Sequence, residues 1–597
     1  MRSAIWCITV LMIRPTVPEA AASGQDVLAK GVSRGLPDGG WVLRLVTALR
    51  RSPGFGSHLT IAALLAIILG IGLRTGIVAM RSYVEDVIFF ADNAWRVLWG
   101  QRPHVDYSAG LGPVTYLLSG LGIKLAGGNL NGLGYGNAVA GVAIGIWGYA
   151  LLVRRVSGWL AVAGAAMLCL LAVAPVQLGE SFRLSTIAMS YNRQGYALLG
   201  LLMVESFPLR QAEQARGVGG ALSTGAVCAI LLFLKANYFL VGLVLAATSL
   251  VWSGRLERRR VFALAAGFTV VAMAFLAYLR FDVGAIFADL RMAADARSGA
   301  VSLASLRQTL AENFPGFLML AGLAALVQMT GRPPADGGWL GRLLRLRALA
   351  LAGMVYCGGV LLLTTNCQLE RLPLHELLAL LFLDSILQSP WLDARRAAGL
   401  AAMAIGLILG TQGSDGLALL NGLRLKLHPP REFAYSVTGG GFAGAIFIDD
   451  YLDTRGTHLA HGNFLATYLN DGRDLLLREL QPGEKVTTMD TYNPFPFALG
   501  IEPPRGGMAS ATYQYLYSDR YHPTADAFFG NSDVVMFPKE HALTDAKWEG
   551  MKKYYIPEMQ RRFAQVAESA QWRMYRRRKC QGKVESSAFE QSRKFRF

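Results

Sequence analysis

Long apolar runs separated by short polar or basic segments dominate the first two thirds of the chain. A helix that crosses a bilayer needs about 20 apolar residues. Seven runs approach or reach this length: 59–80, 131–153, 158–178, 262–280, 313–329, 348–365 and 397–412. Four further runs are shorter or carry a polar residue such as Glu205 or Asp384: 191–206, 220–234, 238–252 and 373–388. The pattern therefore predicts an α-helical polytopic membrane protein with about eleven transmembrane helices.

The hydropathy falls after residue 412. Apolar and polar residues mix over 464–480 as in an amphipathic helix, and a second helix is expected over 544–555. Three segments have the composition of β-strands: 485–490, 533–538 and 563–575. Four tyrosines recur mostly at a period of two, as on one face of a strand: Tyr513, Tyr515, Tyr517 and Tyr521. The chain thus divides into three expected parts: an N-terminal tail (1–57), a transmembrane domain (58–412) and a soluble α/β domain (413–597).

The positive charges predict how the helices are oriented. The chain carries 58 Lys+Arg against 41 Asp+Glu, and Lys and Arg are retained on the cytoplasmic side of a membrane. The five loops assigned to the inside hold 14 Lys+Arg in 50 residues: 154–157, 207–219, 253–260, 330–347 and 390–396. The five segments assigned to the outside hold 10 in 104 residues: 81–130, 179–190, 235–237, 281–312 and 366–372. We therefore expect the N-terminus inside and the C-terminal domain outside, in the periplasm. The apolar run 113–127 then lies along the outer interface.

The N-terminal segment 1–23 resembles a secretory signal, with Arg2, an apolar stretch over 4–13 and three alanines. Cleavage there would leave the basic segment 24–57 to be translocated against the charge bias. We therefore expect this segment to belong to a cytoplasmic tail or to result from a misassigned start codon.

Composition narrows the function classes. The basic residues are dispersed between apolar runs and form no continuous patch, which excludes nucleic acid as the expected partner. The expected partner is the lipid bilayer. The sequence has no Gly-x-x-x-x-Gly-Lys-Ser/Thr phosphate loop, and its six cysteines show no metal-ligand spacing.

The most informative segment follows the first apolar run. It contains four carboxylates: Glu85, Asp86, Asp92 and Asp106. Carboxylates at a membrane face are costly to desolvate and often mark a functional site. The alternative is a solvated loop that happens to be acidic.

This segment resembles a known family. The acidic pair is followed by Ala-x-x-x-Leu-x-Gly ending at Gly100, by Pro-x-x-Asp ending at Asp106, and by Gly112-Pro113. This succession of motifs resembles the first periplasmic loop of polytopic GT-C-type glycosyltransferases that use polyprenyl-phosphate sugars. This group includes lipid A aminoarabinose transferases and protein O-mannosyltransferases. Leu-Lys235-Ala-Asn-Tyr, Glu370-Arg371-Leu-Pro373 and the closing segment 566–576 are similar to further features of that family.

The resemblance implies roles for particular residues. Asp86 or Glu85 would be the base that takes the proton of the acceptor hydroxyl. Asp106 would hold the acceptor, or a divalent cation where one is used. Three cations on the predicted outer side would bind the donor phosphate: Lys235, Arg193 and Arg371. The alternative for each cation is contact with lipid headgroups only.

The sequence thus predicts a glycosyltransferase of the bacterial inner membrane. It would move a hexosyl or pentosyl group from a polyprenyl-phosphate donor to a lipid or glycan acceptor at the periplasmic face. A transporter or flippase of lipid-linked glycans is the alternative, and an envelope scaffold is a third. The acidic cluster and the large outer domain favour the enzyme, and no internal repeat typical of transporters is evident.

Overall fold

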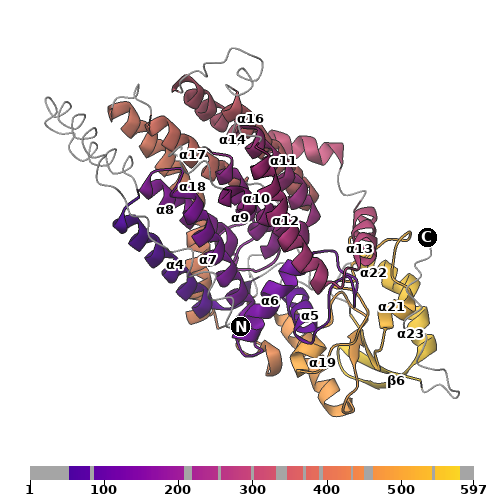
Figure 1. Ribbon diagram of the computed structural model, residues 1–597. Coiled ribbons are helices and arrows are strands. Elements are labelled where there is room, and N and C mark those ends of the chain that lie inside the picture. The colour runs from indigo at the N-terminus through magenta and orange to yellow at the C-terminus, as the bar shows by residue number, and fades with distance from the viewer. Residues whose placement is uncertain are drawn as a thin grey trace.

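Each of the eleven apolar runs forms a helix in the computed structural model (Figure 1). The structure describes residues 53–80, 86–207, 218–252, 257–297, 302–330, 346–366, 372–388, 394–431, 434–448, 462–540 and 545–578. The helices are α4 (Phe55–Thr75), α7 (Gly132–Leu152), α8 (Gly158–Val173), α9 (Ser190–Glu205), α10 (Gly219–Leu234), α11 (Ala236–Trp252), α12 (Arg258–Tyr278), α14 (Leu303–Thr330), α16 (Arg347–Asn366), α17 (Leu374–Leu387) and α18 (Ala394–Leu427).

Five of these helices are long and apolar enough to cross a membrane: α4, α7, α12, α14 and α16. Several large apolar side chains on them face outward, such as Val270, which is 70% exposed, and Phe262, which is 72% exposed. Such exposure is expected of a surface that faces lipid. The chain is therefore a helical membrane protein, while the total number and the direction of its crossings stay predictions.

Close helix packing explains part of the high glycine content. A Cβ atom on Gly225 of α10 would lie 2.0 Å from the carbonyl oxygen of Leu264 in α12. A Cβ atom on Gly267 of α12 would lie 2.2 Å from the carbonyl oxygen of Leu222 in α10. The two backbones therefore approach too closely for any larger residue, as is common between membrane helices.

The helix α18 runs through residue 412, where the sequence predicted the end of the transmembrane domain. Near its C-terminal end, Lys426 Nζ donates to Asn131 Oδ1 at 2.8 Å and to the Gly444 carbonyl at 2.6 Å. A small sheet lies at the same end, in which β3 (Ile446–Ile448) pairs in parallel with β1 (Val78–Met80) and antiparallel with β2 (Ala434–Tyr435). Segments from both halves of the chain thus close this end of the bundle.

The C-terminal part contains a second sheet in the order β4-β5-β7-β6. Its strands are β4 (Val486–Thr488), β5 (Val534–Pro538), β6 (Phe563–Glu568) and β7 (Trp572–Arg577). Its helices are α19 (Gly462–Glu479), α20 (Phe495–Leu499), α21 (Ala525–Phe529), α22 (Asp545–Gly550) and α23 (Ile556–Arg562), with a π-helical turn (Met551–Tyr555) before α23. The predicted helices over 464–480 and 544–555 and the strands near 485–490 and 533–538 are confirmed.

Two details of the C-terminal part differ from the prediction. The segment 563–575 forms a hairpin of two strands, because Asp471 accepts hydrogen bonds from Ser569 Oγ and the Gln571 amide and stabilises a turn there. The four tyrosines over 513–521 do not lie on a strand. Their segment is a folded loop in which Tyr513 and Tyr517 meet at one isolated bridge.

Three further helices join the bundle to the C-terminal part: α5 (Asp86–Leu98), α6 (Pro113–Leu125) and α13 (Val283–Ala296). Figure 1 shows α5 and α13 between the helical bundle and the C-terminal helices. Arg96 of α5 is 2% exposed, pairs with Asp92 at 3.1 Å and donates to the carbonyl oxygens of Pro504 and Gly506. Burial raises the pKa of Asp92, and the neighbouring Arg96 opposes that rise. This buried pair fixes the acidic segment against the C-terminal part.

Candidate functional site

A break between two helices presents Lys235. Helix α10 ends at Leu234, Lys235 has an extended backbone, and α11 begins at Ala236. The Lys235 carbonyl accepts from the Tyr238 amide at 3.1 Å, so Lys235 also starts α11. The first amide groups of a helix have no partner within that helix and carry a partial positive charge. The backbone of Lys235 therefore lies at the N-terminal end of α11.

Two helices contribute side chains around the Lys235 ammonium. Lys235 Nζ donates to Asn366 Oδ1 at 2.6 Å, in the last residue of α16, and to Asn192 Oδ1 at 3.2 Å, in the first turn of α9. It also lies 5.0 Å from the centre of the Tyr191 ring. The two amide oxygens accept from the ammonium and so fix its position. We call Tyr191, Asn192, Lys235 and Asn366 the Lys235 cluster.

The hydrogen bonds of the cluster fix the orientation of both amides. An ammonium group only donates, so Asn192 and Asn366 must both turn Oδ1 toward it. The Nδ2 group of Asn366 then donates to the Tyr238 hydroxyl at 3.1 Å. The Nδ2 group of Asn192 is buried and has no hydrogen-bond partner among the residues that the structure describes. Leaving a buried donor unpaired costs about 1–3 kcal/mol. Such a donor beside a cation suits an anionic oxygen ligand.

A second cation lies at the same end of α16. Arg297, directly after α13, donates through Nη1 to the Thr365 carbonyl at 3.4 Å. Its guanidinium carbon lies 3.7 Å from the centre of the Tyr515 ring. Asn237 Nδ2 donates to both Thr365 Oγ1 and Asn366 Oδ1 at 3.0 Å. Lys235 and Arg297 are thus held at adjacent residues of one helix end. A cation at a helix C-terminus is also favourable without any ligand.

Asp86 also lies near Tyr191. It is the first residue of α5, and its Oδ1 accepts from the Tyr492 hydroxyl at 3.3 Å. Asp86, Arg297 and Tyr515 all lie within electrostatic range of the Tyr191 phenol. The structure therefore brings two of the predicted site residues, Asp86 and Lys235, to one region around Tyr191.

The other predicted site residues are placed differently. Arg193 is 2% exposed, pairs with Asp415 at 2.6 Å and donates to the carbonyl oxygens of Leu171 and Val176. Its side chain therefore holds α9 against α8 and α18 and does not join the Lys235 cluster. Asp106 Oδ2 accepts from the Arg102 amide at 2.8 Å and so closes a turn of the loop between α5 and α6. Glu85 and Arg371 lie outside the described residues.

Sequence reasoning missed Arg297, Asn192 and Asn366. Each had a usable signal, because Arg297 and Asn366 lie in segments that the charge count assigned to the outer side. Asn192 directly precedes Arg193 in the motif that was selected for its arginine. The sequence offered no way to decide which of these neighbours turns toward Lys235.

A buried pair fixes the helix that carries Arg297. His104 Nδ1 lies 2.8 Å from Asp289 Oδ2 of α13, and the same oxygen accepts from the Ala109 amide at 2.8 Å. Burial raises the pKa of Asp289, and the contact with His104 opposes that rise. The loop between α5 and α6 is therefore held against α13, the helix that Arg297 follows.

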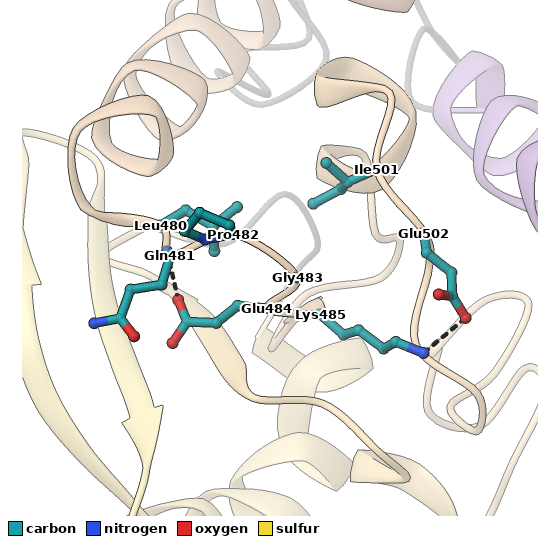
Figure 2. Close-up of a pocket in the computed structure, with 8 residues that line it drawn as sticks. All are labelled: Leu480, Gln481, Pro482, Gly483, Glu484, Lys485, Ile501 and Glu502. Atoms are coloured by element: carbon teal, nitrogen blue, oxygen red, sulfur yellow. Dashed lines mark hydrogen bonds and ion pairs between the residues drawn. The ribbon is translucent and has the colours of Figure 1, made fainter.

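The C-terminal part has a surface hollow of about 340 Å³, drawn in Figure 2. It is lined by Leu480, Gln481, Pro482, Gly483, Glu484, Lys485, Ile501 and Glu502. Lys485 and Glu502 form an ion pair at 2.7 Å across its rim. Because this pair neutralises its own charges and the hollow includes no residue of the Lys235 cluster, we favour the cluster as the functional site. Within the part of the chain that the structure describes, no group of three or more His, Cys, Asp or Glu side chains is arranged to hold a metal ion.

Comparison with known proteins gives a distant likeness only. No protein-family model matches the chain, and no curated protein matches it. Among solved structures it is similar to ArnT from Cupriavidus metallidurans, crystallised with bound undecaprenyl phosphate. The two chains are 13% identical, and the match covers 87% of this chain and 98% of that chain with a TM-score of 0.41. A likeness at this level transfers no residue role, so the assignments below depend on the contacts of the cluster.

Proposed function

We propose that this chain is a membrane glycosyltransferase that moves a sugar from a polyprenyl-phosphate donor to a lipid or glycan acceptor. The proposal includes a bacterial inner membrane, an inside N-terminus and a reaction at the periplasmic face. The observation that supports it is the convergence of Lys235, Arg297 and the unpaired Asn192 Nδ2 group, with Asp86 near Tyr191. This arrangement supplies cations and a donor for a phosphate, and a carboxylate for a proton.

The phosphate side of the site follows from charge. A lipid-phosphate sugar releases its phosphate as an anion, and cations that face the developing charge stabilise the transition state. Lys235 and Arg297 would supply these cations, and Asn192 Nδ2 would donate to a phosphate oxygen. The N-terminal end of α11 would add the partial charge of its free amides. Arg371, five residues after Asn366 in the sequence, is proposed as a third cation.

The carboxylates of the site would activate the acceptor hydroxyl. As the acceptor oxygen forms a bond to the anomeric carbon, the bond from that carbon to the phosphate oxygen breaks and its electron pair leaves with the lipid phosphate. Asp86, with Glu85 beside it in the sequence, would take the proton of the acceptor hydroxyl. Asp106 would position the outer loop, and Arg193 would hold α9 through Asp415.

The test compares the envelope glycans and glycolipids of a strain that lacks this protein with those of complemented strains. We expect one sugar to be missing from one glycan or lipid of the deletion strain. The wild-type chain should restore it, and Lys235→Met should not. Identical envelope sugars in all strains would exclude the proposed transferase. Lipid-linked glycans retained on the inner side of the membrane would instead support the transporter.

A further inference from the structure

Two tyrosines of the C-terminal part contact an acidic and a basic side chain of the proposed site. The Tyr492 hydroxyl donates to Asp86 at 3.3 Å, and the Tyr492 ring packs on Phe89 with centroids 5.8 Å apart. The Tyr515 ring lies 3.7 Å from the Arg297 guanidinium carbon, and its carbonyl accepts from Arg297 Nε at 3.4 Å. The C-terminal part therefore contacts the carboxylate and one cation directly.

The loop that carries Tyr515 is fastened to α13, the helix that Arg297 follows. Ser518 Oγ donates to Asp295 Oδ2 at 2.6 Å, and the Arg291 guanidinium lies 4.7 Å from the centre of the Tyr521 ring. Both α13 residues lie within six positions of Arg297. The loop and the end of α13 are thus held together, which keeps the Tyr515 ring against the Arg297 guanidinium.

The contact with Tyr515 determines which edge of Arg297 a ligand would meet. A guanidinium stacks through its flat face and donates from its edge, so stacking on a ring leaves the donors usable. Nε donates to Tyr515 and Nη1 to Thr365, and within the described chain Nη2 makes no hydrogen bond. A free arginine side chain has many rotamers, and the ring restricts them.

We propose that the C-terminal part is a working component of the donor site, in which Tyr515 is a positioning residue that presents Arg297 Nη2 to the donor phosphate. This inference rests on the proposed function. It differs from a role in which the ring only fastens the two parts of the protein together, because fastening would change stability and leave phosphate binding unchanged.

The test measures binding of undecaprenyl phosphate to the full-length chain in lipid nanodiscs. Tyr515→Leu keeps most of the volume but removes the aromatic face, and we expect the affinity to fall about tenfold. Tyr515→Phe keeps the face and should bind within about twofold of wild type. Tyr575→Ala, which removes a tyrosine from β7, is the matched control and should bind as wild type.

A double variant shows whether Tyr515 affects phosphate binding through Arg297. If Tyr515 acts through Arg297, then adding Tyr515→Leu to Arg297→Met should lower the affinity no further than Arg297→Met alone. Wild-type affinity in Tyr515→Leu, or a further fall in the double variant, would overturn the positioning role. Failure of the wild-type chain to bind undecaprenyl phosphate would instead overturn the proposed function.

Discussion

The Lys235 ammonium lies 3.2 Å from Asn192 Oδ1, across the space between the first turn of α9 and the break between α10 and α11. Because the ammonium only donates, this contact fixes the other end of the Asn192 amide as an unpaired buried donor. A protein that needed only a packed junction here would gain stability by removing that donor. We propose that this donor binds a ligand oxygen.

Exchange of Asn192 tests this explanation. Asn192→Asp keeps the oxygen that accepts from Lys235 and replaces the unpaired NH₂ group with a carboxylate oxygen. We expect the ligand-free variant to be about as heat-stable as wild type, because the ion pair formed with Lys235 offsets the cost of burying a carboxylate oxygen without a donor. We expect its affinity for undecaprenyl phosphate to fall by about tenfold or more, since like charges repel. Thermal unfolding and lipid titration measure both effects, and unchanged affinity would contradict the role.

Asp86 is tested through turnover. Asp86→Asn keeps the shape of the side chain but cannot take a proton, so sugar transfer should fall by roughly 10²–10⁴-fold while undecaprenyl phosphate still binds. Glu85 carries the same carboxyl group and is the second candidate for the base. Glu85→Gln and the double variant therefore complete the series. Asp474→Asn, which alters an exposed carboxylate of α19, is the control. Wild-type transfer in the double variant would remove the base from the mechanism and favour the transporter.

The helices could be predicted from sequence because a bilayer imposes length and hydropathy on every crossing segment. All eleven runs form helices over most of their length, although residues 78–80 of the first run form β1, and the pattern located α19 and β5 as well. Contacts between distant segments could not be predicted in this way. The strand β1 pairs with β3, more than 350 positions later, and nothing in either three-residue segment specifies the other.

For the site, the sequence yields only a predicted side of the membrane for each residue. Charge counting put Lys235, Arg193 and Arg297 on the outer side, and it gave no information on where their side chains point. Arg193 turns to Asp415, 222 positions away, whereas Arg297 turns to Tyr515. The partner of each arginine depends on tertiary contacts that no local sequence pattern specifies.

Acid stability should depend on Asp519, which orders the loop of Tyr515. Hydrogen bonds from Tyr554, Tyr513 and Lys553 hold the pKa of Asp519 well below its ordinary value of 3.8. A depressed carboxyl pKa stabilises the fold above the unfolded pKa, and this contribution is lost as the pH falls through the folded value. Wild type should therefore lose roughly 1–3 °C more in Tm than Asp519→Asn between about pH 5 and pH 2.5. The effect is small because the carboxylate is 57% exposed, and equal slopes in both proteins would contradict it.

The predicted topology is tested with reporter fusions. The distribution of Lys and Arg predicts an inside N-terminus and an outside C-terminus. A reporter that is active only in the periplasm should therefore be active when fused after Phe597 and inactive when fused near Arg259. The reverse pattern would put Lys235 and Asp86 on the cytoplasmic side and contradict the proposed periplasmic reaction.

Binding of undecaprenyl phosphate to Lys235→Met tests the central claim most directly. The substitution keeps the apolar stem and removes the charge that would face the lipid phosphate. Lys124→Met, which alters an exposed lysine at the end of α6, is the matched control. We expect wild type and Lys124→Met to bind with the same affinity, and Lys235→Met to lose at least tenfold while it inserts into membranes and unfolds as wild type does. Equal affinity in all three proteins would contradict a phosphate site at Lys235.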